Sequence, residues 1–446
     1  MKRLRNLLIG IWILVIAGVI LLVTLLLPQI MASQAVIENG NATSTALAFS
    51  LLHIPSLTPA PSPTDTALPP PTVTRASPDP VLEPSPSPEP PPFTLTPQES
   101  RGINPLTGLS VSNLSMLDRR PIAVKITNYP RSVRSYQYGL TRADVVYEYY
   151  IEDGLSRFIA IFYSKDATTA GPVRSGRYFD EHIARMYHAI LVFANADERV
   201  EKYLLNSDLL PFLFVSRSDN CPPLCRNTRI QGYNNLFIDT SGVGKFLKYR
   251  QTDNSRQSLR ASYFSETMVW HPGQIAIDTI FTFYSNYAYN YWEYNPARHV
   301  YLRYSDVQDV DPEKNLHEGY APHIDQLTDE QIITDNVVTL LVPHSFKTEY
   351  DRADQVFDIQ LYGEGAAYIF RNGTMVEGKW VRDAIDQPIR LMDTYNNPLG
   401  LNRGITYYEV LDPESIILQN GKTINFIFFI PPRSLTPTPE TKKVAP

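Results

Sequence analysis

The chain has 446 residues, which is long for one compact domain and predicts two or three folding units. Hydrophobic residues make up 43% and charged residues 19%, a composition that excludes a wholly disordered or fibrous chain. The net charge of −6 argues against nucleic acid as a partner, because neutralising phosphates requires a basic face. With only two cysteines, the chain is not a disulfide-dense scaffold.

The N-terminus has a basic cluster followed by a long apolar run. Residues 1–6 include Lys2, Arg3 and Arg5, and residues 7–27 contain no charged side chain. At about 1.5 Å per residue in a helix, this run matches a hydrocarbon core of about 30 Å. By the positive-inside rule, we expect a cytoplasmic stub at residues 1–6, a transmembrane helix at residues 7–27 and an extracytoplasmic body. A cleavable signal peptide is the alternative.

A proline-rich stretch follows the apolar run. Of the 37 prolines, 16 fall between Pro55 and Pro97, among serines and threonines. Proline favours extended polyproline II geometry and has no amide hydrogen to donate, so residues 28–100 predict a semi-stiff linker rather than a domain. At about 3.1 Å per residue, the 43 residues from Pro55 to Pro97 could reach on the order of 100 Å. Residues 431–446 are similar in composition and predict a disordered tail.

The rest of the chain predicts an α+β protein, with a mixed α/β domain at residues 104–246 and a β-rich domain at residues 270–430. In the second region, two strand-like runs flank Asn372-Gly373, a dipeptide favoured in two-residue hairpins. Residues 281–294 are dense in phenylalanine, tyrosine and tryptophan. These rings fit the face of a sheet, and the alternative is that they offer flat surfaces to a sugar or a peptide.

A first hairpin is predicted around Asp153-Gly154, which separates the strand-like residues 145–152 and 155–162. Pairing Glu152 with Leu155 would place Glu148 and Arg157 on one face as diagonal neighbours. They would then form either an ordinary cross-strand ion pair or a pair that orients a ligand.

A helical pattern begins after residue 175, with Ser175 as the expected N-cap. Arg174 and Arg177 flank that position. Free amides and the helix dipole favour negative charge there, so the two arginines predict an anion-binding site. The alternative is that both arginines pair with nearby acidic residues.

Three strings in this region carry a resemblance: RRPIAVKITNYP, GLTRADVVYEYYIEDGLSRFIAIF and GPVRSGRYF. They are similar to the N-terminal domain of family 3048 of the domains of unknown function, the YerB-like lipoproteins. Residues 363–404 resemble the companion C-terminal domain. The resemblance implies two extracytoplasmic domains behind an export signal, with a helix here in place of the usual lipidated cysteine. The positions that it carries over are Glu148, Glu152, Gly154, Arg157, Gly171, Pro172, Arg174, Ser175 and Arg177.

The chain departs from the family pattern at three places. Thr127-Asn128 stands where typical members have Asp-Asn, residues 194–197 replace a His-Ala-Gly-Gly-like string, and residues 233–236 replace Pro-His-Asn-Leu. Two histidines and an aspartate are therefore missing, and these residue types are suited to binding metal or moving protons. Any family chemistry that depends on them would be lost in this member.

The remaining motifs predict neither a metal site nor a cofactor. Cys221 and Cys225 lie in a loop-like stretch, and two thiolates alone do not make a structural zinc site. In an oxidising exterior, we expect a local disulfide between them; free thiols or a weak redox pair are the alternatives.

The sequence gives two hypotheses for function. The first is a cell-envelope binding or scaffolding module that is not an enzyme and engages an anionic glycan, peptide or protein. Its expected binding residues are Glu148, Glu152, Arg157, Arg174, Ser175, Arg177 and Asn235. The second is an envelope hydrolase or transferase that uses Glu148 or Glu152 as general base. A deep pocket around Glu148 would favour the enzyme, and an arginine-lined groove would favour the binding module.

The predicted topology can be tested by proteolysis. Protease added to intact cells should digest the body, because the basic cluster before residues 7–27 keeps only residues 1–6 in the cytoplasm. The digestion is followed by immunoblotting against the body. Resistance until the membrane is broken would contradict the topology.

Overall fold

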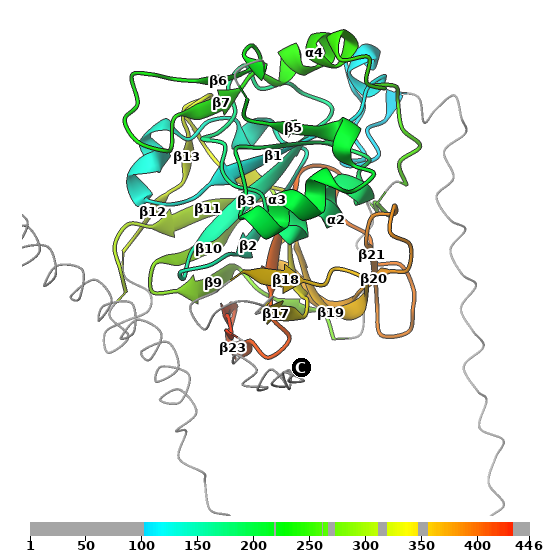
Figure 1. The fold of residues 1–446 in the computed structure, drawn as a ribbon. Coiled ribbons are helices and arrows are strands. Elements are labelled where there is room, and N and C mark those ends of the chain that lie inside the picture. Colours follow the sequence, from blue (N-terminus) through cyan, green and yellow to red (C-terminus); the bar gives the residue numbers. More distant parts are fainter. Residues whose placement is uncertain are drawn as a thin grey trace, which may run out of the picture.

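The computed structural model describes residues 102–217, 220–260, 262–265, 273–310, 319–346 and 356–430. The predicted stub, transmembrane helix, linker and tail (residues 1–6, 7–27, 28–100 and 431–446) lie outside these ranges. Within the described residues, no helix has both the length and the apolar character needed to span a bilayer. This part of the chain is mostly β with few helices, and it is built around a large central sheet (Figure 1).

The large sheet has 11 strands among the described residues, in the order β21-β20-β19-β16-β22-β2-β3-β1-β4-β5, with β8 paired to β20. Its strands are β1 (Ile122–Thr127), β2 (Val145–Tyr150), β3 (Ser156–Phe162), β4 (Ile190–Phe193), β5 (Leu213–Val215), β8 (Ile275–Ala276), β16 (Asn336–Leu341), β19 (Gly363–Arg371), β20 (Thr374–Arg382), β21 (Arg390–Met392) and β22 (Thr406–Leu411).

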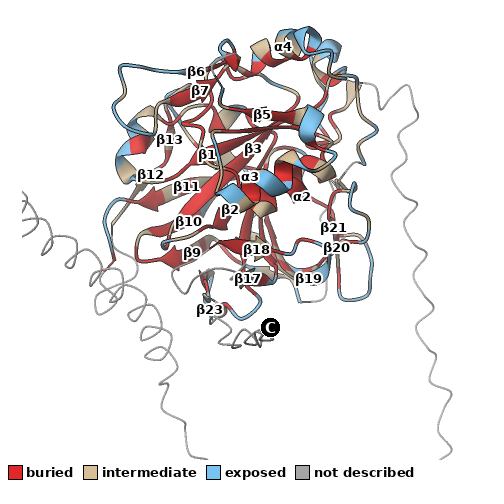
Figure 2. Ribbon diagram, viewed as in Figure 1, coloured by how far each residue is buried: buried red, intermediate tan, exposed pale blue. Residues whose placement is uncertain are grey.

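Both halves of the chain contribute to this sheet. The parallel pairing of β2 with β22 joins a strand near residue 148 to one near residue 409. Every residue of β1, β2, β3, β16 and β22 is buried, because both faces of the sheet are covered (Figure 2). One continuous hydrophobic cluster therefore includes residues from Leu106 to Phe428.

A second sheet of seven described strands covers one face of the first. It consists of β9 (Thr279–Ser285), β10 (Ala288–Asn295), β11 (Val300–Asp306), β12 (Tyr320–Pro322), β15 (Ile333–Thr334), β23 (Ile416–Asn420) and β24 (Thr423–Ile427). Two-stranded pairs are formed by β6 (Leu224–Arg226) with β7 (Leu236–Ile238), β13 (Ile324–Asp325) with β14 (Glu330–Gln331), and β17 (His344–Phe346) with β18 (Phe357–Ile359).

Helices α2 (Tyr178–Met186) and α3 (Glu198–Leu205) cover the opposite face of the large sheet, and α4 (Val243–Tyr249) lies beyond its β5 edge (Figure 1). The 3-10 turns are η2 (Leu114–Leu117), η3 (Arg131–Tyr136), η4 (Leu140–Arg142), η5 (Leu210–Phe212) and η7 (Thr240–Gly242). Helix α2 packs on β2 through Phe179, whose ring contacts the rings of Tyr147 and Tyr149.

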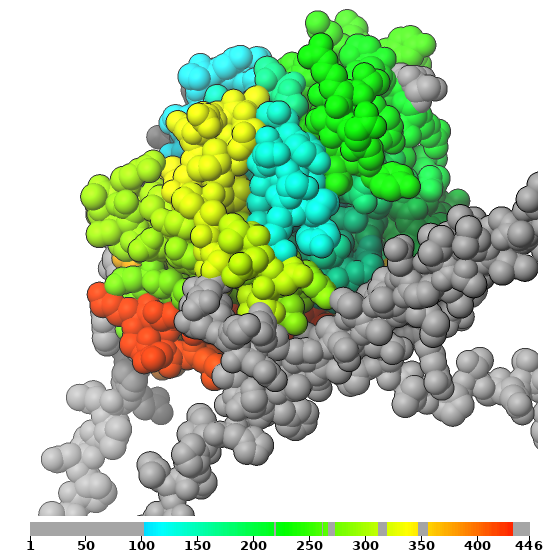
Figure 3. Space-filling model, turned by 90° about the vertical axis from the view of Figure 1, so that its left-hand side faces the viewer, coloured from blue at the N-terminus to red at the C-terminus, as the bar shows by residue number. Residues whose placement is uncertain are grey.

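Segments from the two halves also meet at the surface. Figure 3 shows the cyan segment near residues 130–140 beside the yellow segment near residues 320–340. There, the Asp325 carboxylate accepts hydrogen bonds from the backbone amides of Gly139 (2.8 Å) and Thr141 (2.7 Å). The contact ties the N-terminal half to the β13–β14 pair.

The register predicted for the first hairpin is wrong by one residue. Asp153 and Gly154 have the positive φ values expected of the turn, but Ile151 donates its amide hydrogen to the carbonyl of Leu155 (2.8 Å), so Glu152 is left out of the ladder. In the observed register, Tyr149 lies opposite Arg157. A one-residue shift moves every side chain of a strand to the other face relative to its partner.

This shift separates Glu148 from Arg157. Glu148 now lies opposite Phe158 and faces the second sheet, whereas Arg157 faces the helices with Tyr149. The predicted diagonal pair is therefore not formed. The second hairpin has the expected geometry: Arg371 pairs with Thr374 across Asn372-Gly373, and both turn residues have positive φ.

The predicted aromatic segment, residues 281–294, lies mainly in β9 and β10 of the second sheet. Its rings pack against one another and against neighbouring strands: Tyr291 stacks on Tyr304 with 4.4 Å between ring centroids. Trp292 is fully buried between the two sheets. Packing on a sheet thus accounts for much of this aromatic density.

Cys221 and Cys225 form a disulfide at the start of β6, with 4.8 Å between their Cα atoms. The bridge closes the short turn that leads into the β6–β7 pair. The intact mass of the freshly isolated protein should therefore rise by about two hydrogens on reduction, because a disulfide forms from two thiols by loss of two hydrogen atoms. Mass spectrometry with and without reductant measures this difference, and two alkylatable thiols in the unreduced protein would contradict the bridge.

Candidate functional site

Helix α2 begins two residues later than the sequence indicates. Arg177, not Ser175, is the N-cap, and the backbone amide of Arg177 donates a hydrogen bond to Oδ2 of Asp180 (2.8 Å). The Ser175 hydroxyl instead contacts Oδ1 of Asn195 (2.7 Å). The prediction of Ser175 as N-cap is wrong, because the Asp180 carboxylate holds the first turn from inside the helix.

The two arginines flanking Ser175 lie in different surroundings. Arg177 forms an ion pair with Glu152, and its Nε lies 2.8 Å from Oε2 of that residue. The side chain of Arg177 is only 9% exposed and also donates to the carbonyl of Gly176 (2.8 Å). Its partners are thus already in place, and they tie the β2–β3 turn to the start of α2.

Arg174 points instead into a cavity of about 330 Å³. We call this cavity the arginine pocket; its polar lining is Thr127, Ser156, Arg157, Arg174, Tyr233 and Asn234. Thr127 and Arg157 are paired across β1 and β3, which fixes one wall of the pocket on the central sheet. Arg174 comes from the loop between β3 and α2, and the other wall comes from the loop before β7.

Neither arginine of the pocket has a carboxylate partner in the described part of the chain. Arg157 donates from Nη1 to the carbonyl of Ser175 (3.1 Å), and Arg174 donates from Nη1 to the carbonyl of Tyr233 (3.3 Å). The buried atoms Nε of Arg174 and Oδ1 of Asn234 have no hydrogen-bond partner among the described residues. The pocket therefore offers a donor and an acceptor beside two positive charges.

The electrostatics of the pocket agree with this geometry. Burial lowers the pKa of Arg157 to about 10, although Tyr149 and Asp180 act in the opposite direction. Burial, with added repulsion from Arg157 and Arg226, lowers the pKa of Arg174. Positive charge gathered at one site without a paired carboxylate would be stabilised by a bound anion.

Three residues at which we expect the chain to depart from the family pattern lie at or beside the arginine pocket. Thr127 and Asn234 line it, and Asn195 holds the hydroxyl of Ser175 beside it. Asn235 does not line the pocket, because its side chain holds Arg226 (2.7 Å) within the β6–β7 loop. Of the predicted binding residues, the structure thus brings Arg157 and Arg174 together here and places Asn235 elsewhere.

Glu148 belongs to a buried network between the two sheets. It lies directly beside Glu409 on the neighbouring parallel strand, and Arg303 from β11 forms ion pairs with both carboxylates. The side chains of all three are at most 1% exposed. Trp292 (2.9 Å) and Tyr284 (2.8 Å) donate further hydrogen bonds to Glu409.

A second buried network lies on the helix-covered face. Lys125 from β1 pairs with Asp180 of α2, with 3.2 Å between Nζ and Oδ1, and the Tyr149 hydroxyl contacts both groups. Burial, opposed by Asp180 and reinforced by Arg157, lowers the pKa of Lys125 to about 7.

Arg303, Glu409 and Lys125 were not among the residues expected at the site. Each is a charge inside a strand of mostly apolar and aromatic residues, and a buried charge requires a partner, so this pattern is the signal that could have found them. Among the described residues, no group of three or more His, Cys, Asp or Glu side chains could hold a metal ion.

The pH dependence of stability tests the Glu148 network. Burial, opposed by Arg303 and reinforced by Glu409, raises the pKa of Glu148 to about 7 from 4.5. Because this pKa is higher in the folded state, the stabilisation is fully present below about pH 4.5 and is lost as the pH rises to about 7. Its size is at most about 3 kcal/mol.

Glu148→Gln should remove this component, so its unfolding free energy should fall less than that of the wild type between pH 4.5 and 7. Urea denaturation across the pH range measures the slope. Glu293→Gln is the matched control, since Glu293 is exposed on β10 and this variant should keep the wild-type slope. Identical slopes for wild type and Glu148→Gln would contradict the prediction.

The family model described as "Protein of unknown function (DUF3048) N-terminal domain" matches residues 106–254, and the model of the DUF3048 C-terminal domain matches residues 279–408. The protein named "Putative lipoprotein YerB" of Bacillus subtilis (strain 168) is 26% identical over 286 residues, which are 62% of this chain and 77% of the relative.

The fold is similar as well. The crystal structure of YerB protein from Bacillus subtilis matches with a TM-score of 0.55 and 21% identity, covering 69% of this chain and 96% of that chain. At this identity the likeness concerns the fold alone. The resemblance drawn from the sequence strings is confirmed by the two family models: the chain belongs to the DUF3048 family, and both its N-terminal and its C-terminal domain are present.

Proposed function

We propose that this protein is a membrane-anchored, extracytoplasmic binding module that takes an anionic group of an envelope glycan, peptide or protein into the arginine pocket. The observation that carries the proposal is the pair Arg157 and Arg174, which share one cavity without a described carboxylate partner. Guanidinium groups bind carboxylates, sulfates and phosphates through forked, charge-assisted hydrogen bonds.

The anchoring part of the proposal rests on the sequence. The uncharged run at residues 7–27 is long enough for one span, and residues 28–100 would hold the body away from the bilayer. The YerB relative is named a lipoprotein, which supports a location at the membrane for this protein, although its proposed anchor is a helix and not a lipid.

The enzyme hypothesis has less support. Glu148 is 1% exposed and lies between the two sheets, and none of the described cavities is lined by it. Glu152 is engaged by Arg177. A general base must reach the proton that it removes, within hydrogen-bond distance or through one water. A binding module therefore fits the positions of these carboxylates better than a hydrolase or transferase does.

The proposal predicts that Arg157→Gln and Arg174→Gln each weaken anion binding by about tenfold or more, because each removes a charge-assisted hydrogen bond. Isothermal titration of the full-length protein with sulfate, phosphate, glucuronate and triglutamate measures the affinity. The wild-type affinity should fall with added salt, and that salt dependence should weaken in the variants.

Two control variants separate binding from folding. Arg229→Gln makes the same change of charge at an exposed position in the β6–β7 loop and should leave the affinity unchanged. Arg177→Gln breaks the buried pair with Glu152 and should lower the melting temperature more than it lowers the affinity of the folded protein. Equal affinities for wild type, Arg157→Gln and Arg174→Gln would contradict the proposal.

A further inference from the structure

Tyr203 of α3 stands between two hollows on the helix-covered face. The first, of about 520 Å³, lies beside the end of α3 and the loop that follows it. The second, of about 510 Å³, lies between α2, α3 and the segment that begins with β18. Both have the size of small-molecule sites, roughly 300–1,000 Å³, and both are lined by Tyr203.

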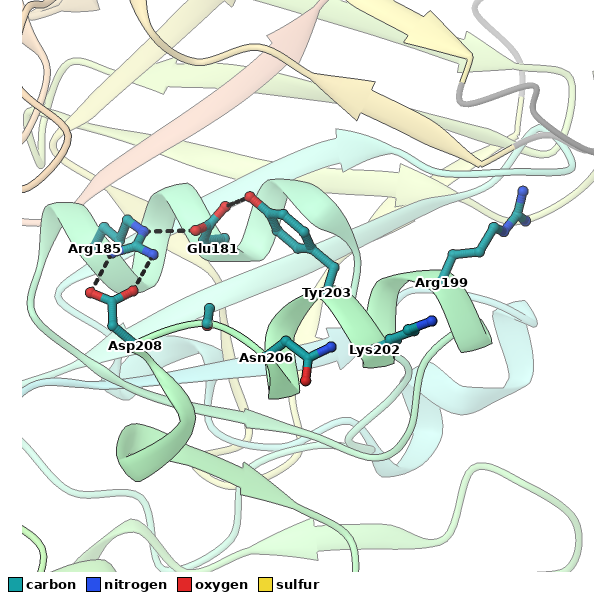
Figure 4. A pocket seen from close by; sticks show the side chains of 8 residues that line it. Glu181, Arg185, Arg199, Lys202, Tyr203, Asn206 and Asp208 are labelled. Atoms are coloured by element: carbon teal, nitrogen blue, oxygen red, sulfur yellow. Dashed lines mark hydrogen bonds and ion pairs between the residues drawn. The ribbon is translucent and has the colours of Figure 1, made fainter.

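The ring of Tyr203 is held in a fixed orientation. Its hydroxyl donates to Oε2 of Glu181, and Oε1 of the same carboxylate accepts from Nε of Arg185 (2.7 Å). Arg185 in turn binds Asp208 after α3 (2.6 Å), so a chain of four side chains joins both helices (Figure 4). The residue is 45% exposed, and its ring meets that of Tyr178 edge to face at 5.2 Å. A fixed, half-exposed ring can bind a flat or puckered ring at low entropic cost.

The chemistry of the linings excludes strongly apolar and strongly charged ligands. Among the described residues, no aliphatic side chain lines either hollow; the lining consists of tyrosines, amides, a serine, a histidine and charged groups. The acidic side chains are Glu181, Asp208 and Asp358, and the basic ones are Arg185, Arg199 and Lys202. The charges therefore balance, since burial and the nearby Arg382 lower the pKa of His182 to about 4 and leave it neutral.

We propose that the two hollows beside Tyr203, together called the Tyr203 groove, are a second binding site that is independent of the arginine pocket. This site takes an uncharged saccharide with one sugar ring stacked on Tyr203. A sugar presents apolar C–H groups on the face of its ring and hydroxyls around its edge. Tyr203 matches the face, and the amides, carboxylates and guanidiniums match the hydroxyls as acceptors and donors. Tyr362, 57% exposed at the rim of the second hollow, provides a ring for a further sugar unit.

A peptide fits this groove less well than a saccharide does. Peptide recognition in a groove relies on apolar anchor side chains, and the groove has no aliphatic pocket for them among its described lining residues. A strongly anionic or cationic partner would meet three acidic and three basic side chains, so attraction to one set would be offset by repulsion from the other.

The test uses the full-length protein and a panel of neutral oligosaccharides: chitotriose, cellotriose and maltotriose. Isothermal titration and saturation-transfer NMR measure binding. At least one of them should bind the wild type, and Tyr203→Ala should weaken that binding by at least about tenfold. Tyr203→Phe should weaken it less than Tyr203→Ala does, because the ring remains and only the hydroxyl bond to Glu181 is lost.

Further variants show whether a loss of saccharide binding comes from misfolding or from the arginine pocket. Tyr362→Ala leaves the Glu181 network intact and should weaken binding of the trisaccharides even if Tyr203→Ala proves unstable. Tyr249→Ala, which removes an 85% exposed tyrosine at the end of α4, should have no effect. Arg174→Gln should also leave the saccharide affinity unchanged. A loss of anion binding can therefore be told apart from a loss of saccharide binding.

Two outcomes would overturn the inference. One is the absence of binding by every saccharide in the panel. The other is unchanged saccharide affinity in Tyr203→Ala and Tyr362→Ala.

Discussion

The fold depends on one buried arginine between two carboxylates. Glu148 and Glu409 lie side by side on adjacent parallel strands, where two like charges would repel each other without Arg303 from the second sheet. Removing Arg303 would cost about 3–5 kcal/mol, because both carboxylates would lose their positive partner in a medium of low dielectric. The network therefore fixes how the second sheet packs on the first, and it ties β2 from the N-terminal half to β22 from the C-terminal half.

That packing decides which charged groups reach the surface. Glu148 is enclosed between the sheets, whereas Arg157, on the opposite face of the same hairpin, opens into the arginine pocket. Arg174 and Arg177 are separated in the same way: Arg177 is held by Glu152, and Arg174 faces the cavity. Residues that are close in sequence thus have different roles, because the groups around them differ in burial and in available partners.

The two regions matched by the family models share the large sheet and one hydrophobic cluster. The positions where we expect this chain to depart from the family pattern include Thr127 and Asn234, which line the arginine pocket, and Asn195 beside it. Neutral or small side chains at Thr127 and Asn234 leave the two arginines as the dominant charges of the pocket.

The family and the positions of both hairpin turns could be predicted from the amino-acid sequence, and Arg157 and Arg174 could be named as candidate binding residues. These features depend on local patterns, such as Asn-Gly and Asp-Gly turns, or on strings that the family shares. The pairing of Arg157 with Arg174 in one pocket and the register of the first hairpin depend on the folded structure, where Leu155 pairs with Ile151 and Glu148 is moved away from Arg157. The folded structure also brought Arg303 to Glu148 and Glu409 across more than 100 residues of sequence. An exposed arginine and a buried one look alike in a strand pattern, because burial depends on which strands pack together and not on the residues beside it in the chain.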